Sequence, residues 1–392
     1  MSEQYQKTVE QRADSFSCPS CGGRMRFDAE SGKLKCPYCG AFKEVKVDTR
    51  KPNEYDIASA PKADEKAWGD VTRVMRCKGC GAEIVLTGET TADNCAFCGA
   101  PHVMEDQGSA GIAPESVIPF SVTQKQAVTG FRRWIKRKLF APGKAKKMAA
   151  LGEITGVYLP HWTYDADSVS DYVGQEGHYY YVTVPVTVTK DGKSHTEMRQ
   201  ERRTDWRPTH GRVENSFDDV VVAGSRRLPE DLLQRVRPYD LEKLLRYEPG
   251  FLSGFASEKP AVDVNEGWAE AQRIIDEHMT ELAREDILAR ADEARVTRVE
   301  TKNSHVKYKL TLLPMYLSAF KFKNKSYNVL VNGQTGQVGG KAPVSPLRVA
   351  IAVLLGIGLI ALLYFLFMGA DDGETVSYAY DYLSNAVGRL LG

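Results

Sequence analysis

A frame of four cysteines occurs twice in this 392-residue chain, and it constrains the fold more than any other feature. Each copy has the form C-x2-C-x14-C-x2-C. The first copy consists of Cys18, Cys21, Cys36 and Cys39, and the second of Cys77, Cys80, Cys95 and Cys98. Four thiolates at this spacing are a typical ligand set for tetrahedral zinc. Because the frames contain all eight cysteines, none remains for a disulfide framework or a lone nucleophile.

Each frame predicts a zinc ribbon, a small β-hairpin unit that folds only around its metal. A glycine follows every cysteine pair, at Gly22, Gly40, Gly81 and Gly99, and glycine adopts the left-handed turn that a metal-binding knuckle needs. Four cysteines close the coordination shell, whereas a catalytic zinc keeps one position open for water. His102 follows the second frame, but no fifth ligand is required. We therefore expect two structural Zn²⁺ ions.

A run without any charged residue extends from Val349 to Ala370. As a helix it is roughly 33 Å long at 1.5 Å per residue, enough to cross a hydrocarbon core of about 30 Å. The alternative is a buried helix of a large domain, which is rarely so uniformly apolar this close to a C-terminus. The run predicts one transmembrane helix.

The flanks of this run predict its orientation. Lys341 and Arg348 precede it, and three acidic residues follow it: Asp371, Asp372 and Glu374. By the positive-inside rule the N-terminal part lies in the cytosol. Thiolates that must stay reduced to hold metal favour the same compartment. We expect a single-pass protein of the bacterial plasma membrane, with its C-terminal tail outside.

The chain divides into eight segments by composition. We expect a disordered leader at 1–14, ribbons at 15–46 and 73–104, polar linkers at 47–72 and 105–116, an α+β domain with a largely antiparallel sheet at 117–342, a transmembrane helix at 349–370 and an extracytoplasmic amphipathic tail at 371–392. The tail either rests on the outer leaflet or contacts a second membrane subunit.

Within the α+β domain, residues 178–203 predict a hairpin that turns at Asp191-Gly192. Helical patterns start near Pro229 and at Asp240, and a long helix is expected from about Val264 to Arg295. Two strand runs, at 306–325 and 326–338, lead toward the membrane segment. Long strand runs without alternating βα units favour the antiparallel sheet.

The segment Lys125–Lys147 carries nine basic residues and no acid. Val128, Phe131, Trp134, Ile135 and Leu139 mark an apolar face on the same helix. A basic amphipathic helix can lie on anionic lipid or on a partner. It can equally pack on the sheet with a solvated basic side, which the position of Lys138 within the apolar face slightly favours.

Nucleic-acid binding is the main alternative to protein binding. Tyr38 and Phe97 occupy equivalent knuckle positions, where a ring either stacks on a base or covers its own hairpin. Charge argues against DNA, because 52 Lys+Arg nearly balance 51 Asp+Glu and the second ribbon lacks a basic stripe.

No enzymatic motif stands out. A phosphate-binding loop is missing, and Asp276-Glu277-His278 lies on the long helix, facing outward, without a nucleotide site to serve. His161, Asp165 and Asp167 are close together in sequence, but nothing nearby completes a mechanism. We therefore expect that the chain is not an enzyme.

Three stretches carry a family resemblance: residues 18–40, 158–177 ("YLPHWTYDADSVSDYVGQEG") and 327–345 ("YNVLVNGQTGQVGGKAPVS"), followed by a membrane span. Together they resemble bacterial double-zinc-ribbon, single-pass membrane proteins, often called transcription-factor-IIB-type zinc-ribbon or primosomal (replication-restart) helicase-like proteins. The resemblance implies association with membrane-stress systems, in which relatives help bring flotillin-like (SPFH) or phage-shock proteins to the membrane.

The sequence and the resemblance together predict a membrane-anchored adaptor that recruits or organises cytosolic or membrane partner proteins. Two ribbons on one tether raise avidity by effective concentration, by roughly 10²-fold or more when the geometry allows. The alternative is a nucleic-acid-binding zinc-ribbon protein related to replication restart.

Overall fold

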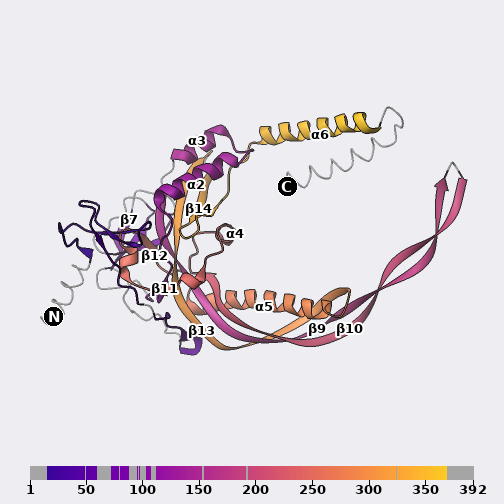
Figure 1. Cartoon of the computed structure of the whole chain (residues 1–392), viewed down its shortest axis with the longest axis horizontal. Helices are drawn as coiled ribbons and strands as arrows, with labels where there is room; N and C mark the ends of the chain where they lie inside the picture. The colour runs from indigo at the N-terminus through magenta and orange to yellow at the C-terminus, as the bar shows by residue number, and fades with distance from the viewer. Residues whose placement is uncertain are drawn as a thin grey trace.

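The computed structural model describes residues 16–48, 50–59, 72–78, 80–87, 95, 97, 103–106, 112–151, 154–190, 193–323 and 325–368. The predicted leader at 1–14 and tail at 371–392 lie outside these residues. The molecule is elongated and curved (Figure 1). One end, here called the head, contains the described residues of the cysteine segments 15–46 and 73–104 and the helices above them. The other end is a projecting β-hairpin.

Three long antiparallel strands form the body of the molecule. They are β9 (Thr155–Lys190), β10 (Lys193–Ala223) and β13 (Glu293–Phe322). β9 and β10 pair from Lys190 opposite Lys193 onward, which confirms the predicted hairpin. β13 pairs with the other edge of β9 up to Glu293, which lies opposite Gly177. Beyond that point β9 and β10 continue as a two-stranded arm, defined here as His178–Asp205.

Shorter strands extend this sheet in the head. They are β4 (Tyr55–Asp56), β8 (Ser116–Val117), β11 (Leu245–Arg246), β12 (Ala256–Glu258), β14 (Lys325–Asn332) and β15 (Val338–Gly340). Only the pairs β12–β9 and β13–β8 are parallel among the described strands. The α+β class with a largely antiparallel sheet is therefore confirmed.

The long helix α5 (Val264–Leu288) lies in the concave side of the curved sheet (Figure 1). Asp263 caps its N-terminus by accepting hydrogen bonds from the backbone N–H groups of Asn265 and Glu266. Every fourth residue along its inner face is buried: Ala271, Ile275, Met279, Ala283 and Ile287. The helix ends earlier than the predicted Arg295, because Glu293 already begins strand β13 and pairs with β9.

Gly267 sets how closely α5 approaches the sheet. A Cβ atom at this position would collide with the Tyr164 hydroxyl and would lie 3.0 Å from the Trp162 ring. The space is needed because Tyr164 donates a hydrogen bond to the Val264 carbonyl, at 2.7 Å. The helix is thus tied to β9 at its first turn.

The basic segment forms two helices, α2 (Gln124–Arg137) and α3 (Gly143–Leu151). A capping box between Thr123 and Gln126 fixes the start of α2. Its inner face, Ala127, Phe131 and Ile135, is buried in the main core. This confirms the prediction that the helix packs on the sheet. Leu139, expected on the same apolar face, lies beyond the end of the helix and is 76% exposed.

The first cysteine segment has its own antiparallel sheet of β1 (Arg26–Asp28), β2 (Lys33–Lys35) and β3 (Phe42–Lys43). The second contributes β5 (Thr72–Cys77), β6 (Glu83–Thr87) and β7 (Val103–Asp106) to the 12-stranded main sheet, because β6 pairs with β12. The predicted linkers also contain strands, since β4 pairs with β13 and β8 begins at Ser116.

Short elements connect these parts: α4 (Glu230–Gln234) and the 3₁₀ turns η2 (Ile57–Ser59), η3 (Leu241–Lys243) and η4 (Pro249–Leu252). The helix predicted from Asp240 is only the η3 turn, because the chain then enters strand β11. The apolar C-terminal helix α6 (Pro346–Met368) extends away from the head. Its segment Pro346–Tyr364 is long and apolar enough to cross a membrane and is not buried against the described chain.

Candidate metal centres

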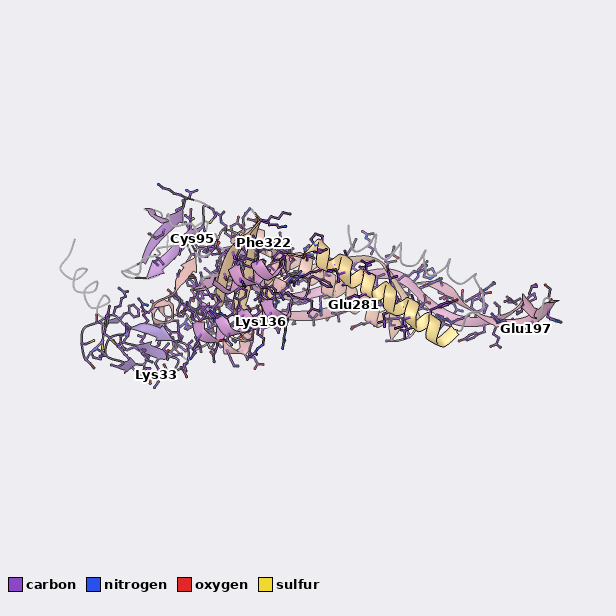
Figure 2. The ribbon with its side chains drawn as sticks, turned by 90° about the horizontal axis from the view of Figure 1, so that it is seen from above. Lys33, Cys95, Lys136, Glu197, Glu281 and Phe322 are labelled. Atoms are coloured by element: carbon purple, nitrogen blue, oxygen red, sulfur yellow. The ribbon has the colours of Figure 1, made fainter. Side chains whose placement is uncertain are left out.

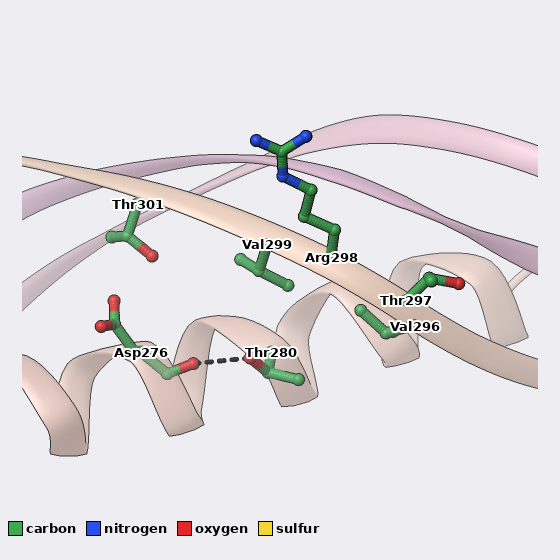
Figure 3. Close-up of a pocket in the computed structure, with 7 residues that line it drawn as sticks. All are labelled: Asp276, Thr280, Val296, Thr297, Arg298, Val299 and Thr301. Atoms are coloured by element: carbon green, nitrogen blue, oxygen red, sulfur yellow. Dashed lines mark hydrogen bonds between the residues drawn. The ribbon is translucent and has the colours of Figure 1, made fainter.

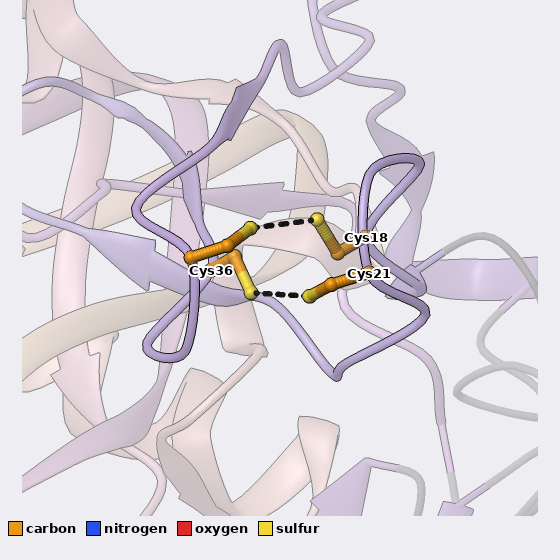
Figure 4. Close-up of side chains that lie close together, drawn as sticks. Cys18, Cys21 and Cys36 are labelled. Atoms are coloured by element: carbon orange, nitrogen blue, oxygen red, sulfur yellow. Dashed lines mark hydrogen bonds between the residues drawn. The ribbon is translucent and has the colours of Figure 1, made fainter.

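The first cysteine cluster brings together the four thiols that the sequence predicted. The Sγ atoms of Cys18 and Cys39 are 3.5 Å apart, as are those of Cys21 and Cys36. All four Sγ atoms lie within 4.8 Å of one another. In a tetrahedral site with Zn–S bonds of about 2.3 Å, the sulfur atoms are separated by roughly 3.8 Å. Figure 4 shows these side chains converging from two loops, in an arrangement compatible with structural zinc.

Both loops of this cluster have the same backbone turn. In the first, the N–H of Gly22 donates to the carbonyl of Cys18, and in the second that of Gly40 donates to the carbonyl of Cys36. The two glycines have φ values of +71° and +77°, in the left-handed region that other residues rarely adopt. The glycine after each pair therefore lets the chain fold back so that both cysteines face one point.

The same turns direct backbone N–H groups at sulfur. The N–H of Ser20 contributes most to holding the pKa of the Cys18 thiol down, to about 6. The N–H of Cys39 has the corresponding effect on Cys36, whose pKa is also lowered. Hydrogen bonds to the charged form favour the thiolate, which is the form that binds metal. The first cysteine of each pair is therefore prepared for ligation by its own loop.

The first cluster is joined to the body through 3₁₀ turn η4. Phe27 of β1 packs edge-on against Phe251, with ring centroids 5.5 Å apart. The backbone N–H of Phe27 donates to the Ser253 carbonyl at 2.8 Å, and the Ser253 hydroxyl donates to the Met25 carbonyl at 2.7 Å. Cys18 and Cys36 are buried in this contact, whereas Cys21 and Cys39 are exposed. One side of the cluster thus faces the core and the other faces solvent.

The second cluster contains Cys77, Cys80 and Cys95, whose Sγ atoms also lie within 4.8 Å of one another. Cys80 and Cys95 are 3.7 Å apart. The predicted fourth ligand, Cys98, lies outside the described residues. Gly81 repeats the turn of the first cluster, with φ +71° and its N–H donating to the Cys77 carbonyl. The three described thiols are therefore compatible with a second structural zinc site.

The second cluster is built into another apolar core of the body, distinct from the one that buries α2. Cys77, Cys95 and Phe97 pack with residues of β9, α4 and β13 in one apolar group. Arg227 holds the turn from outside, donating to the carbonyls of Cys80 and Gly81, the latter at 2.7 Å. Sequence analysis missed this arginine, because it lies far along the chain from the turn it contacts. In Figure 2, Lys33 and Cys95 mark the two cysteine segments on different sides of the head.

The two knuckle aromatics, which the sequence placed at equivalent positions, have different environments. Tyr38 is 80% exposed, whereas Phe97 is 7% exposed. Phe97 therefore covers its own core, and only Tyr38 presents a ring to solvent. A pair of matching base-stacking platforms is not formed.

The polar residues considered above as a possible site, His161, Asp165 and Asp167, each bond to neighbouring residues of the fold. His161 is buried and bonds through Nδ1 to the Leu159 carbonyl, at 3.0 Å, and burial lowers its pKa to about 4. Asp167 is exposed and contacts Ser216 and His305. Asp165 lies beside Asp218 and Asp219, and burial raises its pKa to about 6.

This acidic group already contains a cation. The buried ammonium of Lys309 lies 2.6 Å from Asp219 Oδ1 and 3.1 Å from Glu54 Oε1. Sequence analysis missed this ion-pair network, because its members come from four distant segments and share no local motif. The lysine supplies the charge that a metal ion would otherwise bring.

Asp276, Glu277 and His278 are exposed on α5, as predicted. A groove of about 290 Å³ lies beside Asp276, between α5 and β13, and is lined by Thr280, Val299, Thr301 and neighbouring residues (Figure 3). Arg298 at its rim is paired with Glu300. The lining of the groove places the carboxylate of Asp276 near the hydroxyls of Thr280 and Thr301.

Comparison with curated proteins finds a relative of this chain in sequence. No protein-family model matches the chain, and no solved structure matches it. Over 350 residues the chain is 29% identical to the uncharacterized protein YdjG of Bacillus subtilis (strain 168), a match that covers 86% of this chain and 92% of that protein. The chain is thus similar, over most of its length, to a protein whose name states no activity.

Proposed function

We propose that this chain is a membrane-anchored adaptor that gathers partner proteins at the bacterial plasma membrane. One observation carries the proposal: the same chain has two cysteine clusters in its head and an apolar helix, α6. The described chain does not cover this helix. Closed thiolate sites stabilise a surface, and an uncovered apolar helix requires a bilayer or a partner. Together these features support a binding surface held at a membrane.

Each cluster holds one structural zinc ion in this proposal. Four thiolates complete a tetrahedral shell, so the zinc has no open position for water or substrate. The thiols then act as a cross-link between two loops. Without metal, the short strands β1–β3 have too little apolar surface to maintain the first segment. The ions therefore fix the shape of the head.

The helix α6 anchors the head in this proposal. Lys341 and Arg348 stand before it, and Asp371, Asp372 and Glu374 follow the apolar run in the sequence. This asymmetry supports a cytosolic head by the positive-inside rule. Reduced thiols are maintained in the same compartment.

The partners in this proposal are proteins, with flotillin-like (SPFH) and phage-shock proteins as the class that the family resemblance implies. The two cysteine segments lie on different sides of the head, so each can contribute a separate contact (Figure 2). Two weak contacts at one membrane site strengthen each other through effective concentration.

Nucleic-acid binding remains the second candidate, and one observation favours it. Tyr38 is 80% exposed on the first knuckle, where a ring can stack on an unpaired base. Against it stands the burial of Phe97, which leaves the second knuckle without an exposed ring. Salt-sensitive binding of a single-stranded oligonucleotide that is lost in Tyr38→Ala would favour this candidate over the adaptor.

The adaptor proposal is tested in a bacterium that carries this chain. Proteins that co-purify with the full-length chain from solubilised membranes are identified by mass spectrometry and tagged with a fluorescent protein. A chain truncated after Val344 should leave its partner dispersed in the cytosol. A full-length chain with Cys21→Ser, Cys39→Ser and Cys80→Ser should itself reach the membrane and fail to gather the partner there. A partner that stays at the membrane in both strains would contradict the proposal.

A further inference from the structure

The loop between α2 and α3, residues 138–142, is tied directly to the start of the apolar helix α6. The guanidinium of Arg348 donates from Nη1 to the carbonyls of Leu139, at 3.1 Å, and Ala141, at 2.8 Å. The N–H of Ser345 donates to the Phe140 carbonyl at 2.9 Å. This loop, called the membrane-proximal corner below, therefore lies beside the first turn of α6, as the placement of α2 and α3 in Figure 1 also shows.

The corner exposes apolar side chains that have no cover in the described chain. Leu139 is 76% exposed and Phe140 is 42% exposed. Leu347, at the start of α6, is 69% exposed. Exposed apolar side chains of the loop therefore lie close to the exposed apolar start of α6.

Basic side chains surround this apolar loop. Those that the structure shows as exposed along α2 and α3 are Lys125, Arg132, Arg133, Lys136, Arg137, Lys138, Lys144 and Lys147. None of them forms an ion pair within the part of the chain that the structure describes, and the sequence from Lys125 to Lys147 contains no acid. Uncompensated positive charge next to apolar residues is the composition of an interfacial membrane surface.

Packing fixes which side of α2 is presented. Phe131 and Ile135 are buried in the core, so the basic side must face away from the sheet. At the end of the helix the ammonium of Lys138 lies 4.7 Å from the centroid of the Trp134 ring. The apolar face of α2, which was one candidate for lipid contact in the sequence analysis, is therefore not accessible to lipid. The basic side of α2 and the membrane-proximal corner remain accessible to a bilayer.

We propose that the membrane-proximal corner binds the cytosolic leaflet of the bilayer in which α6 is anchored, a proposal that rests on the membrane anchor of the proposed function. Leu139 and Phe140 enter the headgroup region. Lys136, Arg137 and Lys138 contact the phosphates of anionic lipids. Continuity with α6 selects lipid over a protein partner, because the corner is hydrogen-bonded to the residues at which the apolar helix begins.

This binding orients the head as well as retaining it. A single helix leaves an attached domain free to tilt, whereas a second contact beside it restricts that tilt. Arg348 links the two contacts, since its side chain bonds the corner while its backbone begins α6. The head is then held in a defined orientation on an anionic membrane.

The test uses the full-length chain carrying Leu139→Trp, reconstituted into vesicles that contain bromine-labelled lipids, which quench tryptophan on contact. One set of vesicles contains only phosphatidylcholine, and the other also contains phosphatidylglycerol. Wild-type protein in the same vesicles measures the background from its own tryptophans. We expect Leu139→Trp to add quenching in the anionic vesicles and at least half of that increment to disappear with Lys136→Gln, Arg137→Gln and Lys138→Gln.

The matched control removes three positive charges from the arm instead, with Arg199→Gln, Arg202→Gln and Arg203→Gln, and should leave the quenching unchanged. Added quenching that is absent, or equal in the two kinds of vesicle, in protein that floats with the vesicles overturns the corner proposal alone. Full-length protein that fails to float with either kind of vesicle overturns the membrane anchor and the corner proposal together. A corner that is quenched only after a partner protein is removed belongs to a protein interface, which also overturns it.

Discussion

The two cysteine segments have the same frame in sequence but different roles in the fold. The first has its own three-stranded sheet, separate from the main sheet, and its buried Cys18 and Phe27 join the apolar core around Phe251. The second contributes strands to the main sheet, and its Cys77 and Phe97 are part of the apolar core of the body. A repeated ligand pattern therefore fixes the local geometry of a site but does not determine how the site is joined to its surroundings.

This difference has an energetic consequence. Loss of the first site removes a cross-link from a unit that has its own small sheet and packs on the body with one side. Loss of the second opens the core that also holds β9, α4 and β13. The first segment is suited to presenting an exposed surface, around Cys21, Tyr38 and Cys39, whereas the second extends the main sheet.

The largest expected effect separates the two sites directly. Cys77→Ser and Cys18→Ser should each lower bound zinc from two ions per chain to one. Cys77→Ser should also lower Tm by about 10 °C or more, or leave the protein insoluble, because a structural zinc contributes several kcal/mol to folding. Cys18→Ser should shift the main transition by only about 2–4 °C. Metal analysis and calorimetry measure both effects.

Cys18→Ser and Cys77→Ser also bury a serine hydroxyl, which by itself lowers stability. A second pair of variants separates that effect from the loss of zinc. Cys21 is exposed and Cys80 is half-buried, so Cys21→Ser and Cys80→Ser disturb the core less. The same order of effects is expected. Equal losses of Tm in the two segments would show that the first is as integral to the fold as the second.

The next effect concerns the knuckle aromatics. Phe97→Ala should reduce the free energy of unfolding by about 3–5 kcal/mol, because it leaves a cavity in the core. Tyr38→Ala should change it by less than about 1 kcal/mol, because an exposed side chain leaves no cavity. Denaturant titration of the two variants measures the difference. A large loss of unfolding free energy for Tyr38→Ala would mean that the ring stabilises its own hairpin despite being exposed.

The smallest effect depends on pH and tests a buried carboxyl group beside the second segment. Glu258 on β12 is buried, and one of its oxygens has no hydrogen-bond partner among the described residues. Burial raises its pKa to about 7. Because the folded state binds this proton more tightly than the unfolded state, stability falls as the pH rises from about 4.5 through 7.

Glu258→Gln should therefore stabilise the protein by about 2 kcal/mol at pH 8 and have little effect at pH 4.5. Glu248 provides the matched control beside the first segment. Burial also raises its pKa, but it is less buried than Glu258, so Glu248→Gln should give a smaller gain. Thermal unfolding of both variants at the two pH values checks the sign. A gain for Glu258→Gln that is independent of pH would rule out this electrostatic cause.

Several parts of the molecule could be predicted from patterns of neighbouring residues in the sequence. The cysteine spacing predicted the first cluster and the described part of the second, because ligand geometry depends on a few neighbouring residues. The turn at Asp191-Gly192 predicted the hairpin, and the helical pattern from Val264 predicted α5, although not where it ends. The uncharged run predicted the apolar helix.

Other parts depend on contacts between distant residues and had no local signal. The merging of the second cysteine segment with the main sheet requires β12, which is far away in sequence. The hydrogen bonds of Arg227 to the second knuckle and the ion pair of Lys309 with Asp219 are equally long-range. The extent of β13 was underestimated, because its first residues are charged and resemble the end of the preceding helix.

The arm has a dynamic consequence that sets it apart from the rest of the chain. From His178 to Lys190, β9 has β10 as its only sheet partner among the described strands, over roughly 40 Å at about 3.3 Å per residue. A two-stranded ribbon without a helix or third strand is only marginally stable on its own. Its amide groups should therefore exchange with solvent through local opening, orders of magnitude faster than those of β9 beneath α5, while the head stays folded.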